Sequence, residues 1–175
     1  MTIRPAAEAD IPAIARVHVD TWRAAYAGIV DAAHLASLSY ESFEKRRRER
    51  FVTPGTKTFV AEADGAVFGF AVAGPIRELH GAYDAELYAI YVRPGAARHG
   101  AGKRLLAASA AWLTEEKRRS MLVWVLRDNL AGRRFYEKHG GVLDGTTLGK
   151  IGAQELEEVA YGWPDVAALA ARLST

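Results

Sequence analysis

Runs of apolar residues divide the chain into segments that predict strands and helices in turn. Residues 86–92 form a mostly apolar run of aliphatic and aromatic side chains, and the Arg93-Pro94-Gly95 turn closes it, which predicts a buried strand. A continuous apolar run at 121–126 predicts a strand buried on both faces. Further strands are predicted at residues 2–4, 58–61, 67–72, 142–148 and 155–163.

Two local patterns refine these strands. Asp64-Gly65 lies between the runs at 58–61 and 67–72, and Asp-Gly is a strong signal for a hairpin turn. In the last strand Val159, Tyr161 and Trp163 alternate with smaller residues, which predicts that this strand is half-buried.

Apolar residues at helical spacing predict the helices. The first has Pro12 in its opening turn and Asp10 as its candidate N-cap. A later helix is expected to begin near Gly102 and end near Lys117, and a short one follows Pro164. The basic run at 45–50, Lys-Arg-Arg-Arg-Glu-Arg, lies on a further predicted helix, where we expect a solvated face rather than a site for an acidic partner.

Composition and charge narrow the function classes. The 175 residues, half of them hydrophobic, predict a single domain spanning residues 1–175. A net charge of +2 implies no broad nucleic-acid or membrane surface. The chain has no cysteine, which excludes disulfides and a cysteine nucleophile and is compatible with a reducing cytosol. No signal peptide or run of about 20 apolar residues is visible, so we expect a cytoplasmic protein.

A glycine-rich basic loop separates the strand at 86–92 from the helix that follows it. Unpaired backbone N–H groups and a positive dipole at a helix N-terminus bind anions, so this layout predicts a phosphate site. Two nucleotide motifs fail here. A Walker A motif needs a glycine where this chain has Ala97 and a serine or threonine where it has Arg104. The dinucleotide fingerprint needs a glycine where it has Leu105.

Residues 97–102, Ala-Arg-His-Gly-Ala-Gly, resemble the signature Gln/Arg-x-x-Gly-x-Gly/Ala of the GCN5-related N-acetyltransferase superfamily. Ala97 stands where the family usually has Gln or Arg, and Arg98 is the candidate substitute donor. A second segment resembles the family's Asn…Phe-Tyr-x-Lys-x-Gly pattern; its matching residues are Asn129, Phe135, Tyr136, Lys138 and Gly140.

The resemblance implies a fold and a cosubstrate. The fold is mixed α/β (α+β): a central, mostly antiparallel sheet of about seven strands, helices on both faces, and strands that splay apart around the coenzyme, with residues 164–175 as a short tail helix. The cosubstrate is acetyl-coenzyme A, with no metal. The residues implied to bind it are Ile90, Tyr91, Val92, Arg98, His99, Gly100, Ala101, Gly102, Lys103, Asn129 and Tyr136.

The implied acceptor is a small-molecule or peptide amine. Its expected contacts are Trp22, Tyr26 and Tyr88, with His34 as a further candidate. Small polyamines, amino acids, antibiotics, peptide N-termini and lysines all stay open as acceptors. Related enzymes are often dimers, so a homodimer is expected.

Acetyl transfer to an amine sets chemical requirements. A lysine-like amine, with a pKa of about 10.4, must lose a proton before it attacks, and a carboxylate can take that proton. Glu86 is the candidate base, because it aligns with the glutamate that histone-type members use. Tyr136 is the candidate acid for the departing thiolate, and the backbone N–H of Ile90 or Tyr91 is the candidate oxyanion donor. Direct attack without an acetyl-enzyme is expected.

Structural alternatives stand beside these roles. Trp22 and Tyr26 are equally candidates for core packing, Asn129 for a helix N-cap, and Glu86 for a salt-bridged strand end. Two other functions also stay open: a non-catalytic acyl-coenzyme A sensor on the same fold, and an unrelated anion-binding or protein-interaction domain. Glu86 and Tyr136 together favour the enzyme.

Overall fold

The computed structural model describes residues 1–96 and 100–174. The strands are β1 (Thr2–Pro5), β2 (Lys57–Ala63), β3 (Ala66–Pro75), β4 (Ala85–Val92), β5 (Met121–Leu126), β6 (Val142–Ile151) and β7 (Gln154–Trp163). The helices are α1 (Ile11–Ala25), α2 (Ala32–Ser37), α3 (Tyr40–Phe51), α4 (Ala101–Glu115), α5 (Leu130–Lys138) and α6 (Val166–Leu173), with a 3-10 turn, η1 (Glu8–Asp10), before α1. Each strand predicted from the sequence is present, whereas α2 was not predicted.

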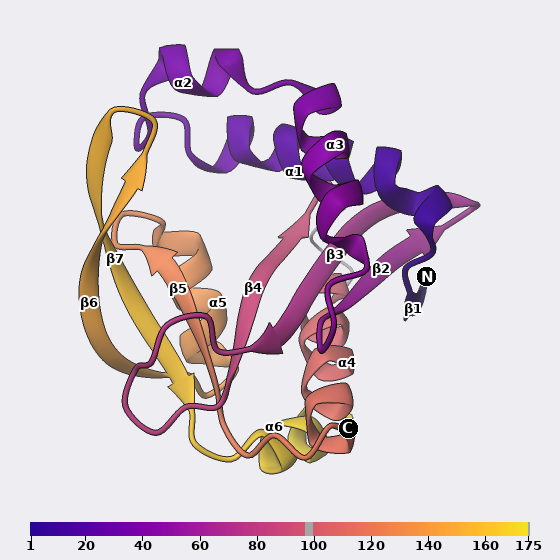
Figure 1. Ribbon diagram of the computed structural model, residues 1–175, viewed down its shortest axis with the longest axis vertical. Helices are drawn as coiled ribbons and strands as arrows, with labels where there is room; N and C mark the ends of the chain where they lie inside the picture. Colours follow the sequence, from indigo (N-terminus) through magenta and orange to yellow (C-terminus); the bar gives the residue numbers. More distant parts are fainter. Residues whose placement is uncertain (97–99, 175) are drawn as a thin grey trace.

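The strands form one seven-stranded sheet in the order β1-β2-β3-β4-β5-β7-β6. Every neighbouring pair is antiparallel except β4 and β5, which are parallel and pair only at Ala85 with Met121 and Glu86 with Leu122. Beyond these two positions β4 and β5 separate, as Figure 1 shows. The mostly antiparallel sheet and its splayed strands are confirmed.

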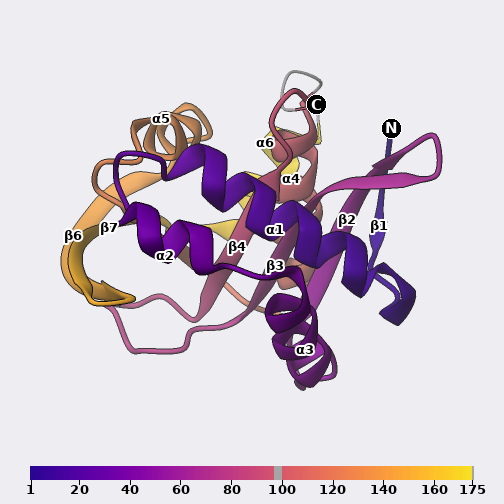
Figure 2. The ribbon, with the colours of Figure 1, turned by 90° about the horizontal axis from the view of Figure 1, so that it is seen from above.

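Helices cover both faces of the sheet (Figures 1 and 2). α1 and α3 lie on one face, where Ile14 and Val17 of α1 pack with Phe70 of β3. α4, α5 and α6 lie on the other face, over the main core. The tail helix is part of this core, because Val166, Leu169 and Leu173 are buried against it.

Two local predictions were wrong. Asp10 precedes α1 as expected, but its carboxylate accepts hydrogen bonds from the Ala7 N–H at 2.7 Å and from the Arg4 guanidinium at 2.7 and 2.9 Å, so it does not cap the helix. The end of β7 is buried on both faces instead of one. Tyr83, in the loop between β3 and β4, covers the second face of β7. Its hydroxyl lies so close to Gly162 that a Cβ at this position would be 1.9 Å from it.

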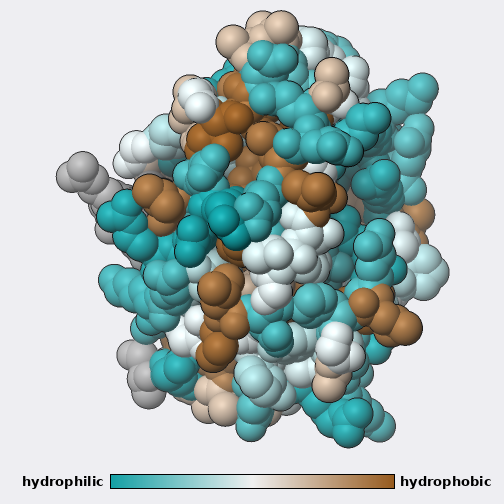
Figure 3. Space-filling view, turned by 90° about the vertical axis from the view of Figure 1, so that its left-hand side faces the viewer, coloured by the Kyte–Doolittle hydropathy of each residue, from teal (hydrophilic) through white to brown (hydrophobic). Residues whose placement is uncertain are grey.

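The outer strand β6 is largely exposed, and Val142, Leu143 and Leu148 are exposed apolar residues on it. On the face shown in Figure 3, apolar side chains form separate groups among hydrophilic ones. Within residues 1–96 and 100–174, every helix is too short or too polar to cross a lipid bilayer.

The packing of α6 gives a stability prediction. Leu169→Ala should lower the free energy of unfolding by about 2–5 kcal/mol, because the buried side chain leaves a cavity between α6 and the sheet. Leu79→Ala, at a residue that is 93% exposed, is the matched control and should change it by less than about 0.5 kcal/mol. Denaturant unfolding of both variants measures the difference; equal effects would contradict the packing described for α6.

Candidate active site

Two cavities meet where β4 and β5 separate. The first, of about 880 Å³, lies between the first turn of α4, α5 and the two strands. The second, of about 500 Å³, lies between α1, β4, β5 and the β6–β7 pair. The residues that line both are Tyr26, Tyr88, Tyr91, Trp124 and Val125. A molecule in one cavity can therefore reach a molecule in the other through the gap in the sheet.

The first turn of α4 forms one end of the first cavity. Gly100 precedes the helix with a φ of 71°, a left-handed conformation that glycine adopts without strain. The first N–H of α4 to join the helical ladder is that of Arg104, which bonds the Gly100 carbonyl at 3.0 Å. The N–H groups of residues 101–103 therefore have no partner within the helix, as at any helix N-terminus.

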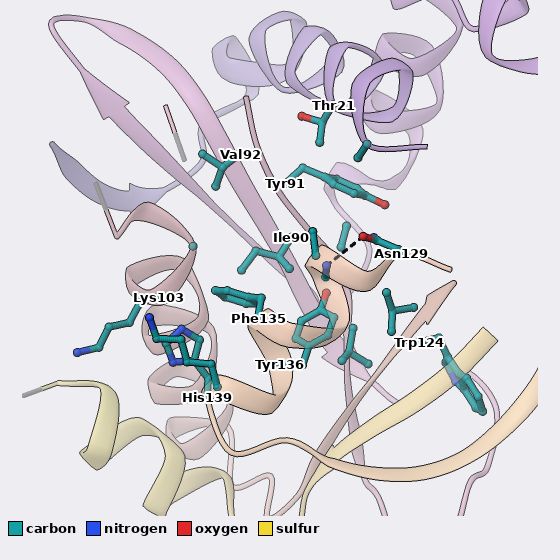
Figure 4. Close-up of a pocket in the computed structure, with 18 of the residues that line it drawn as sticks. Thr21, Ile90, Tyr91, Val92, Lys103, Trp124, Asn129, Phe135, Tyr136 and His139 are labelled. Carbon is teal, nitrogen blue, oxygen red and sulfur yellow. Dashed lines mark hydrogen bonds between the residues drawn. The ribbon is translucent and has the colours of Figure 1, made fainter. Parts of the chain in front are cut away.

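Side chains at the start of α4 divide between the cavity and the surface. Gly102 lines the cavity, and a Cβ there would meet the Phe135 ring at 3.0 Å, so only glycine leaves the ring in place. Lys103 also lines the cavity, and its side chain extends outward along the helix (Figure 4), whereas the Arg104 guanidinium donates to the Met1 carbonyl at 3.1 Å. Arg98 and His99 lie outside the described residues.

A basic group at the same end of the cavity was not predicted as part of the site. Lys138, His139 and Arg172 line the cavity beside Lys103. The pKa of His139 is lowered by burial and by the charges of Lys138, Lys103 and Arg172. Arg172 comes from α6, the tail helix, and no sequence signal connected it with the glycine loop. This end of the cavity suits a ligand with several negative charges.

α5 positions Asn129 and Tyr136 on the first cavity. The Asn129 side chain accepts a hydrogen bond from the Gly132 N–H at 3.0 Å, so the predicted N-cap is confirmed (Figure 4). Tyr136 is 7% exposed, and its ring packs edge-on against Phe135 and Trp163. Its hydroxyl points into the cavity (Figure 4), and burial raises its pKa, so the phenol stays protonated at neutral pH.

β4 forms the wall shared by the cavities. Ile90 and Val92 line the first cavity, and Tyr91 lines both. The register with β3 jumps from Ala89 to Leu87, which leaves Tyr88 as an extra residue. Such bulges bend a strand and turn its backbone groups out of the ladder. Since β5 is also lost as a partner here, backbone N–H groups on this edge of β4 are available to a ligand.

Glu86 lies at the second cavity but is held by Arg77. The Arg77 Nε is 3.1 Å from both carboxylate oxygens, the Arg77 backbone N–H donates at 3.3 Å, and a second guanidinium nitrogen completes the ion pair. The Glu86 side chain is 3% exposed. The alternative of a salt-bridged strand end is therefore observed, at the wall of the second cavity.

Glu158 of β7 is a second carboxylate on this cavity and was missed from the sequence. Burial raises its pKa, the Arg77 charge lowers it, and the Glu86 charge raises it further. In the sequence Glu158 belongs to an acidic strand segment, 155–158, with nothing to separate it from Glu155 and Glu157. Only the pairing of β7 with β5 and β6 brings it beside Glu86 and Arg77.

The residues predicted to contact the acceptor differ in which cavity they line. Tyr26 lines both cavities, while Trp22 lines the second, and their rings meet edge-on at 4.9 Å between centroids. Both also pack with a small core cluster, so core packing and cavity lining are combined in them. His34 lines neither cavity; a Cβ at Gly152 would meet its ring at 2.7 Å, so it packs against the β6–β7 turn instead. Among the described residues, no three His, Asp or Glu side chains are grouped to hold a metal ion.

Comparison with known proteins decides the family. The family model described as "Acetyltransferase (GNAT) family" matches residues 17–141, more than half of the chain. The chain belongs to the GNAT acetyltransferase family. The predicted class, an N-acetyltransferase, is confirmed at the level of this family.

Individual relatives agree with this family. The uncharacterised N-acetyltransferase YuaI of Bacillus subtilis is 41% identical over 170 residues, covering 97% of this chain and 96% of its own. The structure of a ribosomal-protein-alanine N-acetyltransferase from Brucella melitensis has a TM-score of 0.72 at 27% identity and covers 94% of this chain and 99% of its own. PaiA N-acetyltransferase from Thermoplasma acidophilum, solved with coenzyme A, has a TM-score of 0.69 at 23% identity, covering 90% and 98%.

The adjacent basic residues of α4 provide a test of the coenzyme end. Lys103→Gln should weaken acetyl-coenzyme A binding about tenfold and reduce its salt dependence, because Lys103 lies on the cavity wall and its long side chain can turn its ammonium group toward a bound phosphate. Arg104→Gln, one residue on and turned toward Met1, should leave affinity unchanged. Calorimetric titration at two salt concentrations measures the affinity of each variant and its salt dependence. Equal affinities for the two variants would mean that the phosphates of the coenzyme do not bind near Lys103.

Proposed function

We propose that this GNAT-family enzyme transfers the acetyl group of acetyl-coenzyme A directly to an amine held in the second cavity. The observation that carries the proposal is the meeting of two unlike cavities at the gap between β4 and β5. One is basic and opens on the N-terminus of α4, and the other contains carboxylates. The nitrogen–carbonyl bond forms and the carbon–sulfur bond breaks at their junction.

The residues of the first cavity fit the coenzyme. The N–H groups of residues 101–103 and the Lys103 ammonium suit its pyrophosphate, by the anion chemistry of helix N-termini. Apolar Ile90 and Val92 suit its pantetheine arm. The edge of β4 beyond the bulge supplies the backbone N–H of Ile90 or Tyr91 for the developing oxyanion, a contribution of about 3–4 kcal/mol in other acyl transfers.

Tyr136 acts on the leaving thiolate. A thiol of pKa about 8.5 is more acidic than any tyrosine, and the raised pKa of buried Tyr136 widens the difference. Complete proton transfer from the phenol to the thiolate would therefore run uphill even after the carbon–sulfur bond has broken. The phenol instead stabilises the developing thiolate by donating a hydrogen bond as the bond breaks, and the released thiolate takes up its proton from water.

The acceptor's proton goes to the carboxylates of the second cavity. Both Glu86 and Glu158 line it, but Arg77 occupies the Glu86 oxygens as an ion-pair partner. Glu158 has the raised pKa, which makes it the better acceptor for an ammonium proton. We assign Glu158 as the base and Glu86, the base expected from the sequence, as the residue that fixes Arg77.

The first experiment is a calorimetric titration with acetyl-coenzyme A, paired with thiol-release assays over a panel of amines. Tight binding with a responding amine supports the enzyme. Binding without thiol release from any amine would favour the sensor instead, and absence of binding would contradict the whole proposal. The homodimer, the cytoplasmic location and the single-domain boundary at 1–175 stay predictions.

Tyr136→Phe tests the thiolate assignment. The variant should lower kcat on the order of 10²-fold with little change in coenzyme affinity, because only the hydroxyl is lost. Tyr161→Phe is the matched control: this neighbouring buried tyrosine bonds Glu137 and Arg133 instead of facing the cavity, and kcat should be retained. Unchanged turnover of Tyr136→Phe at saturating substrates would contradict a role for the Tyr136 hydroxyl at the leaving thiolate.

The pH profile tests the base. Because a base must be deprotonated, kcat/KM of the native enzyme should fall as the pH drops through the raised pKa of Glu158. Glu158→Gln should remove this inflection and lower kcat/KM at neutral pH on the order of 10²-fold. Glu86→Gln should keep an acidic inflection, moved to lower pH because Arg77 then acts on Glu158 alone. If the inflection remains in Glu158→Gln and is lost in Glu86→Gln, the base is Glu86 instead.

A further inference from the structure

A third cavity, of about 620 Å³, adjoins the second between α1, α3 and the edge of β4. Trp22, Arg77 and Tyr88 line both cavities, so they form a common wall. The third cavity therefore extends the acceptor region away from the coenzyme. Its charged lining residues are Arg46, Arg47, Arg50 and Arg77, with no acidic residue among them.

The expectation that the basic run at 45–50 is a solvated face was wrong for Arg47. Its guanidinium lies over the buried Phe70 ring, 4.9 Å from the centroid, on the α1 face of the sheet. Burial, together with the like charge of Arg50, lowers the pKa of Arg47 to about 10. Because both effects disfavour the charged form, the Arg47 guanidinium gains little stabilisation from water or from neighbouring charges.

Counter-ions for the cluster are absent from the described part of the chain. Among residues 1–96 and 100–174, no carboxylate forms an ion pair with Arg46, Arg47 or Arg50. Arg48, on the same helix, shows the contrast, because it points outward and pairs with Glu8 and Glu44 at 3.0 Å. Arg77 is paired with Glu86, so the cations of this cavity without a carboxylate partner among the described residues are Arg46, Arg47 and Arg50.

His18 of α1 also lines this cavity. It packs against Phe43 with ring centroids 4.3 Å apart, and burial, together with the charges of Arg47 and Arg46, lowers the pKa of the imidazole to about 3. The histidine is therefore neutral at physiological pH, so the positive charge of this cavity comes from its arginines.

We propose that the amine acceptor carries an oxyanion, in the simplest case the carboxylate of an α-amino acid, which docks beside Arg47 while the amine faces Glu158. This inference rests on the proposed function and names the substrate class. Arg47 and Arg50 provide charge-assisted hydrogen bonds to the oxyanion, and Glu86 and Glu158 lie at the amine end. An acceptor with one charge of each sign matches the two connected cavities.

Matched acceptor pairs test this assignment. L-α-amino acids and their carboxamides keep the same amine and side chain but differ in the carboxylate. The native enzyme should favour at least one acid over its amide by tenfold or more in kcat/KM, measured by thiol release. Arg47→Gln should bring this ratio close to one, Arg47→Lys should retain part of it, and Arg48→Gln, the control on the same helix, should retain all of it.

A second measurement is independent of turnover. The complex with coenzyme A, titrated calorimetrically with the preferred acid, should bind it at least tenfold more tightly than does the same complex of Arg47→Gln. Thermal melting checks that the variant is folded; should it not fold, Arg50→Gln, at an exposed residue of the same cavity, carries the test with the same expected direction.

The outcomes separate this inference from the proposed function. Equal use of acids and amides, or an acid preference that survives in Arg47→Gln, would overturn the oxyanion site. Turnover only of amines that carry no anionic group would also overturn the oxyanion site, while leaving the acetyltransferase proposal intact. Coenzyme binding with no thiol release from any amine would overturn both.

Discussion

The parallel pairing of β4 with β5 is the constraint on which the rest of the site depends. The strands share only two paired positions, after which β4 bends at its bulge and β5 continues toward β7. A complete ladder would place backbone against backbone along the whole length. The interrupted ladder instead leaves a gap through the sheet, and the hydrogen-bonding groups on the free edge of β4 become available for chemistry. Stability is supplied by the neighbouring antiparallel pairs, because β3 and β4 stay paired on both sides of the bulge and β5 stays paired with β7 along its length.

Each face of the sheet gives this gap a different environment. On the α4 side, the helix N-terminus, Lys103 and Arg172 make a basic end of the first cavity. On the α1 side, Glu86 and Glu158 line the second cavity with Arg77, and the arginines of α3 lie further out. The carboxylates that line the two cavities are thus confined to the second one. In the proposed reaction this arrangement orients both substrates, and such positioning lowers a barrier without any covalent intermediate.

How far the sequence predicts this site depends on the range of the interactions involved. The glycine loop with α4, and Asn129 with Tyr136, were predictable because each group lies in one continuous segment with a recognisable pattern. Strand positions followed from apolar runs for the same reason. Glu86 was predicted, but Arg77 as its partner, Glu158 and Arg47 were not predictable as site residues, because their surroundings come from segments far apart in the chain. The charge pattern of 45–50 alone could not distinguish the partly buried Arg47 from its exposed neighbour Arg48.

The tail helix α6 has a consequence beyond its packing. Arg172 and Leu173, in the last turn of α6, line the first cavity, while Val166 and Leu169 anchor the helix in the core. The last turn of a helix frays readily, since few contacts oppose its conformational entropy. A ligand that contacts this turn from the first cavity favours its folded state, and by linkage fraying of the turn lowers the affinity for the ligand. The order of α6 therefore reports whether the first cavity is occupied, and protection of its backbone N–H groups from hydrogen exchange would rise when a ligand binds.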